Sequence, residues 1–95
     1  MKPLPVAEIV EAINHEMVDG GSVQLRAAAK DVEAAVVAAL KRDRLYAQIW
    51  VRFLEDRHRY APLLIGALTV LLRDESLASR VEPLLAAYRT AMGRV

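Results

Sequence analysis

The chain has 95 residues, of which 55% are hydrophobic and 26% charged, and its net charge is +1. This size and composition indicate one globular domain spanning residues 1–95 and exclude a disordered chain. Because the sequence has no cysteine, a disulfide framework, a thiolate metal site and a cysteine nucleophile are all excluded. Glycine and proline are scarce, with four of each, so the turns of an all-β fold are missing. We therefore predict an all-α fold, a compact bundle of five or six short helices.

The first predicted helix covers residues 6–18. Apolar side chains recur there at helical spacing, which gives the helix one apolar face. Pro5 suits the entry to this helix, since proline is tolerated in a first turn. The sequence Asp19-Gly20-Gly21 should end it, because a glycine can adopt the left-handed conformation that closes many helices.

Ser22 predicts the start of a second helix, which continues to about Arg42. Serine is a favoured N-cap because its hydroxyl accepts a backbone N–H of the first turn. Seven alanines within this segment would let a neighbouring helix approach closely. Asp31 could also begin a new helix, so a break near Lys30 stays open.

Asp43 is predicted to cap a third helix, from Arg44 to about His58. Four of the five aromatic residues fall between positions 46 and 60, which places this helix at the centre of the core. Its predicted core stripe, with the two aromatic residues that widen it, comprises Leu45, Ile49, Phe53, Leu54, Tyr46 and Trp50.

The fourth predicted helix begins with Pro62 at its first position and ends near Arg73. It is apolar on nearly every side, so we expect it to be the most buried helix. The apolar run over residues 61–72 is too short to span a bilayer, which takes about 20 residues. The residues expected to be among the most buried in the chain are Ile49, Phe53, Leu64, Leu68, Leu71 and Leu85.

The last part begins at Asp74 and is interrupted by Pro83. Proline inside a helix removes a backbone hydrogen bond and costs about 3 kcal/mol. We therefore expect a short helix over residues 75–82 and another that begins at Pro83. Gly93 is a candidate cap at the end.

Catalytic and metal-binding patterns are incomplete. Glu55 and His58 have the Glu-x-x-His spacing of di-iron bundles, but a second such pair is missing, and charged neighbours indicate a solvated helix end. Glu11 and His15 lie four residues apart, which is more typical of a surface ion pair than of a catalytic pair. We found no nucleophile motif or phosphate-binding loop. We therefore predict a non-enzymatic protein with no cofactor and no metal.

Charge is distributed unevenly along the chain. Residues 1–40 hold three basic and six acidic side chains, whereas residues 41–60 hold six basic and three acidic ones. Two interpretations stay open: the two sets neutralise each other within one molecule, or they meet head to tail between copies. The candidate interface residues are Glu8, Glu11, Arg42, Arg44, Arg52, Arg57 and Arg59.

The basic segment 41–59 also supports an alternative function, a small nucleic-acid-binding or regulatory domain. Arg52 and Arg59 are seven residues apart and would share a helix face that could contact phosphates. Acidic residues interleave with the basic ones, and the isoelectric point is only about 8.1. Nucleic-acid binding is therefore the second choice.

Residues 67–85, ALTVLLRDESLASRVEPLL, resemble a helical hairpin of bacterial effector-associated or death-like domains. Pro83 departs from the pattern, and the resemblance transfers no catalytic residue. It implies an adaptor that recruits an effector, such as a protease or a nucleotide-binding switch, in bacterial signalling or defence. We therefore predict a protein–protein interaction module with a protein partner, possible self-association and no membrane span. We expect it in the cytoplasm, since the lack of cysteine fits a reducing compartment and the N-terminus lacks a signal peptide.

Overall fold

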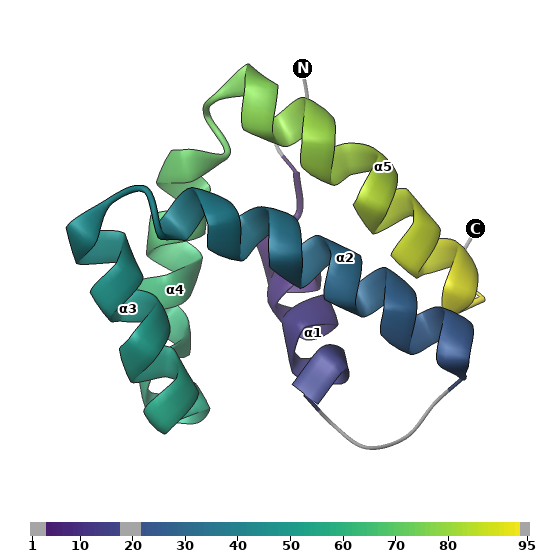
Figure 1. The fold of residues 1–95 in the computed structure, drawn as a ribbon, viewed down its shortest axis with the longest axis horizontal. Coiled ribbons are helices and arrows are strands. Elements are labelled where there is room, and N and C mark those ends of the chain that lie inside the picture. The colour runs from purple at the N-terminus through teal and green to yellow at the C-terminus, as the bar shows by residue number, and fades with distance from the viewer. Residues whose placement is uncertain (1–3, 18–21, 94–95) are drawn as a thin grey trace.

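The computed structural model describes residues 4–17 and 22–93, without the side chains of residues 15–17. Five α-helices make up this part of the chain, which confirms the predicted all-α bundle (Figure 1). The molecule is flat, with extents of 34 × 32 × 18 Å. The helices are α1 (Val6–Met17), α2 (Val23–Leu40), α3 (Arg44–Glu55), α4 (Arg57–Leu71) and α5 (Glu75–Ala91).

Helix α2 is the centre of the bundle. It packs against α1 and α5, while α3 and α4 pack chiefly against each other (Figure 1). Helix α4 also contacts α1 and α2, and α3 contacts α2. Helices α3 and α4 together form a hairpin at one side of the molecule, which we call the α3–α4 hairpin.

The core is formed by one face of each helix. Phe53, Leu64, Leu68 and Leu85 are fully buried, as predicted. Trp50 is also buried, and its ring stacks on that of Phe53 with centroids 5.7 Å apart. The prediction was wrong for two residues, Ile49 and Leu71, which are only partly buried at the edge of the core.

Polar caps start the helices where the sequence indicated. The Ser22 hydroxyl accepts the Leu25 N–H at 3.0 Å, which caps α2. The carboxylates of Asp43 and Asp74 cap α3 and α5 in the same way. Gly93 follows α5 with a φ of +79°, as expected for a glycine that closes a helix. The predicted end of α1 at Asp19-Gly20-Gly21 lies outside the described residues.

The boundary between α3 and α4 differs from the prediction. Helix α3 ends at Glu55, not near His58, and α4 begins at Arg57, not at Pro62. Asp56 explains the shift, because its carboxylate accepts the Arg59 N–H at 3.1 Å and caps α4. Pro62 consequently lies inside α4, where it is exposed, so water can bind the carbonyl that its missing N–H leaves without a partner.

The predicted break at Pro83 was also wrong. Helix α5 runs without interruption from Glu75 to Ala91, with Pro83 on its exposed side. Packing of Val81, Leu85 and Tyr88 into the core holds both halves of α5 in one line despite the lost hydrogen bond. Helix α2 likewise continues through Lys30, which closes the alternative of a break there.

Helix α4 is not the most buried helix, contrary to expectation. It buries Leu64, Ala67 and Leu68, but Leu63 and Val70 are about half exposed, at 54% and 46%. Helix α4 packs chiefly on α3 and makes fewer contacts with α1 and α2, so part of its surface stays exposed. The apolar surface that remains uncovered leads to the candidate site.

Candidate functional site

Large apolar side chains are exposed mainly on the α3–α4 hairpin. Among the described residues, seven large hydrophobic side chains are exposed, and six of them belong to α3 or α4. The seventh is Val23, at the start of α2. Single exposed apolar residues are common, whereas several on one hairpin make that hairpin a candidate interaction surface. The six hairpin residues are Leu45, Val51, Leu54, Leu63, Ile65 and Val70.

These six side chains occupy defined sides of the two helices. On α4, Leu63 and Val70 are seven residues apart and therefore share a face, with Gly66 between them. On α3, Val51 and Leu54 lie on one flank of the buried stripe, whereas Leu45 lies on the other. Leu45 and Leu54 were predicted to be in the core, and the structure corrects both. The buried stripe of α3 is narrow because α3 packs chiefly on α4 and makes few contacts with α2.

Basic side chains gather at both ends of the α3–α4 hairpin. Lys41, Arg42 and Arg44 surround the corner between α2 and α3, and all three are exposed. The other end, where α3 turns into α4, holds Arg52, Arg57 and Arg59, also exposed. The length of α3 separates the two basic ends by about 16 Å, at 1.5 Å per residue.

The acidic residues of the hairpin neutralise few of these charges. The carboxylates of Asp43 and Asp56 accept backbone N–H groups as helix caps. Glu55 forms an exposed ion pair with Arg52 at 3.6 Å. Within the part of the chain that the structure describes, Arg42, Arg44, Arg57 and Arg59 have no ion-pair partner. Arg59 lies two residues before the apolar run of α4, and its guanidinium lies 5.5 Å from the Tyr60 ring centroid.

The acidic residues of the predicted interface lie elsewhere, between α1 and α5. Both Glu8 oxygens accept hydrogen bonds from Arg89, at 2.6–3.0 Å. Glu11 accepts the hydroxyl hydrogen of Tyr88 at 3.2 Å. The hydrogen bond to Glu8 raises the pKa of Arg89 above its usual value, although partial burial opposes the shift. Glu8 and Glu11 therefore have roles inside the molecule, and the structure does not bring them next to the basic hairpin residues.

The two residues of the candidate metal pair, Glu55 and His58, lie in different helices. Glu55 ends α3 and His58 lies in α4, so the helix break at Asp56 removes the shared face that the Glu-x-x-His spacing requires. The side chain of His15 lies outside the described part of the structure. Within that part, no three histidine, aspartate or glutamate side chains are grouped as metal ligands.

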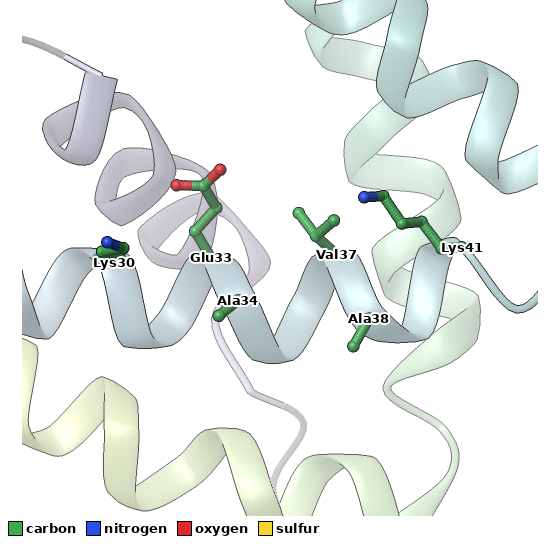
Figure 2. Close-up of a pocket in the computed structure, with 6 residues that line it drawn as sticks. All are labelled: Lys30, Glu33, Ala34, Val37, Ala38 and Lys41. Carbon is green, nitrogen blue, oxygen red and sulfur yellow. The ribbon is translucent and has the colours of Figure 1, made fainter.

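A depression on α2 offers no enclosed ligand site. Figure 2 shows that its lining residues come from α2 and from Lys41, the C-cap residue that directly follows it, with Ala34, Val37 and Ala38 between Lys30 and Lys41. Small-molecule sites are concave and converge polar groups from several elements. A surface lined by one helix lacks that enclosure, so we do not assign it a ligand.

The sequence analysis identified the charges of this site but not its apolar part. The uninterrupted apolar run over residues 61–72 predicted burial, because apolar residues on all sides of a helix usually mean a core helix. The one signal of exposure was Gly66, a glycine in the middle of a helix, where alanine is more stable.

None of the helices in the described ranges is long and apolar enough to cross a membrane. The chain matches no family model, no curated protein and no solved structure.

Proposed function

We propose that this domain is a non-enzymatic protein-interaction module and that the α3–α4 hairpin is its binding surface. The observation that supports this best is the concentration on the hairpin of six of the seven exposed large apolar side chains in the described structure. Uncovered apolar area of this kind has a free-energy cost in water that a partner removes. The basic residues at both ends would set the orientation and speed of encounter.

The same arrangement favours a protein partner over a nucleic acid. Phosphate binding needs cations on one surface and gains little from aliphatic side chains. Here Leu63 and Val70 lie between the two basic ends and would face a phosphate backbone without benefit. Nucleic-acid binding by the basic segment 41–59 remains the alternative, with Arg42, Arg44, Arg57 and Arg59 as its contacts.

The resemblance of residues 67–85 to effector-associated and death-like domains is consistent with an adaptor that recruits an effector in the bacterial cytoplasm. Such an adaptor could also bind a second copy of itself. The head-to-tail contact between Glu8 or Glu11 and the basic segment is the less favoured form, since both glutamates already bond to α5. We therefore place the contact surface on the hairpin.

The test is quantitative affinity purification of the full chain from its source cells, with mass spectrometry of the captured proteins. We compare the wild type with the double variant Leu63→Gln/Val70→Gln and with a control, Ala86→Gln/Ala87→Gln, on the exposed side of α5. The proposal expects at least one protein that the wild type and the control capture equally and that the hairpin variant loses, while all three chains melt at similar temperatures. Equal capture by all three chains, or capture of nucleic acid alone, would contradict it.

A further inference from the structure

Gly66 lies in the middle of α4, and nothing in the fold requires a glycine there. A Cβ added at this position would meet no atom within 4 Å, and its φ is not positive. Glycine lowers the stability of a helix relative to alanine because it is more flexible in the unfolded chain. Gly66 therefore makes the domain less stable than an alanine would, and no contact within the folded molecule compensates for this loss.

A stripe of exposed residues runs along α4 through this glycine. Leu63 and Val70 lie one turn before and one turn after Gly66, and all three share a face. Arg59 lies seven residues before Gly66, and Arg73 lies seven after it, just beyond the last turn of α4. We call these five residues the α4 stripe. Along the helix, the residues of the stripe are in order basic, apolar, glycine, apolar and basic. The stripe is about 21 Å long, at 1.5 Å per residue.

The stripe has the shape that a second helix needs. Without a side chain at Gly66, the backbone of a partner can approach α4 closely, since the distance between packed helices depends on the side chains at the contact. Leu63 and Val70 would then pack on both sides of the crossing point. Desolvation of these two side chains would supply the main gain in free energy.

The charges of the stripe disfavour binding to the same stripe of a second copy of the chain. In an antiparallel pair that crosses at Gly66, Arg59 of one copy would oppose Arg73 of the other. In a parallel pair, each arginine would oppose its own equivalent. Both arrangements place like charges together, which disfavours self-association through this face.

Resting on the proposed function, we infer that the α4 stripe binds an acidic amphipathic helix of another protein. The partner helix would carry a small residue at the crossing point, apolar residues one turn to each side, and an Asp or Glu seven residues to each side. Each carboxylate would pair with Arg59 or Arg73, neither of which has an ion-pair partner among the residues that the structure describes.

The probe for this inference is a displayed library of 18-residue alanine-based helices, randomised at five positions with the spacing of the stripe. Selection on the full chain should enrich Asp or Glu at the two outer positions and apolar or small residues at the three inner ones. The selected peptides should bind Gly66→Leu at least tenfold more weakly than the wild type. A control, Ala87→Leu on α5, should bind them as the wild type does.

Thermal melting shows whether a loss of peptide binding is caused by unfolding of the variant. We expect Gly66→Leu to melt at or above the wild-type temperature, so weaker binding would not be caused by unfolding. If it does not fold, the charge reversal Arg59→Glu/Arg73→Glu replaces it and should shift the selection from acidic to basic outer residues. Failure to enrich peptides, enrichment of basic ones on the wild type, or equal binding to Gly66→Leu would overturn the inference.

Two other outcomes would assign the stripe to a different occupant and equally overturn it. One is a dimer in sedimentation that Gly66→Leu dissociates. The other is binding to anionic phosphatidylserine vesicles that Gly66→Leu abolishes. Affinity purification separates this inference from the proposed function: if Leu63→Gln/Val70→Gln loses a cellular protein but no acidic helix is selected, only the nature of the partner is wrong.

Discussion

Glu8 of α1 and Arg89 of α5 are 81 positions apart in the sequence and form a bidentate ion pair. Arg89 donates from Nε and Nη2 to both carboxylate oxygens of Glu8, and the Glu8 side chain is only 18% exposed. The neighbouring bond from Tyr88 to Glu11 joins the same two helices. Because α1 and α5 each pack on α2, these bonds close the ring of contacts at the ends of the chain.

The first prediction follows from this pair. Glu8→Gln removes the charge and one strong acceptor, so the melting temperature should fall, whereas Glu82→Gln on the exposed side of α5 should leave it nearly unchanged. Differential scanning calorimetry of the three chains measures this. Equal melting of all three would show that the pair contributes nothing to stability.

The pair also predicts how that difference depends on pH. Glu8 raises the pKa of Arg89 in the folded state. The pair therefore stabilises the fold fully at any pH below the pKa that Arg89 has in the unfolded chain. This stabilisation is lost only as the pH rises through the higher pKa of the folded state. An arginine does not reach that range in ordinary buffers. The difference between wild type and Glu8→Gln should therefore be the same at pH 7 and pH 9, and a decline between these values would contradict this explanation.

The second prediction compares adjacent residues on the hairpin. Phe53 is fully buried and stacks on Trp50, whereas Leu54 is 45% exposed. Phe53→Ala should lower the free energy of unfolding by about 3–5 kcal/mol, and Leu54→Ala by roughly 1 kcal/mol or less. Urea titration of both variants measures the two values. Similar losses would show that the boundary of the core on α3 is misplaced.

The third prediction concerns the proline inside α5. Pro83 is exposed, so Pro83→Ala restores a backbone N–H at little cost in packing. Alanine also makes the unfolded chain more flexible, which offsets part of the gain. The net effect should be a stabilisation of about 1–2 kcal/mol. A loss of stability would indicate that α5 needs its proline.

The fourth prediction is that Gly66→Ala stabilises the free domain by about 1 kcal/mol, the usual difference between the two residues in a helix. The open space around the added methyl group makes a clash implausible. Urea titration gives the value, with Ala87→Gly on α5 as the converse change. A destabilised Gly66→Ala would mean that the fold itself requires this glycine.

Features that depend on neighbouring residues could be predicted from the sequence. Ser22 and Asp43 were recognised as caps because a cap bonds to N–H groups two or three residues away. The all-α class and most of the core followed from apolar spacing for the same local reason. The cap at Asp56 was missed because Pro62, a start signal on its own, competed with it.

Features that depend on the arrangement of the helices could not be predicted from the sequence. The helix through Pro83 is held by packing on α2, and the pair between Glu8 and Arg89 has no signature in a sequence that separates them by 81 positions. Exposure of Leu63 and Val70 depends on how many helices surround α4. Consequently the basic half of the site was predictable, whereas its apolar half was not.

Photo-crosslinking in the source cells tests the central claim, a protein partner on the α3–α4 hairpin, most directly. Benzoylphenylalanine is placed one position at a time at Val51 and Val70 on the hairpin, and at Ala86 and Ala87 on α5, all of them exposed. We predict that both hairpin positions give the same discrete protein adduct and that neither α5 position does. Adducts of equal yield from all four positions, or none from the hairpin, would contradict the claim.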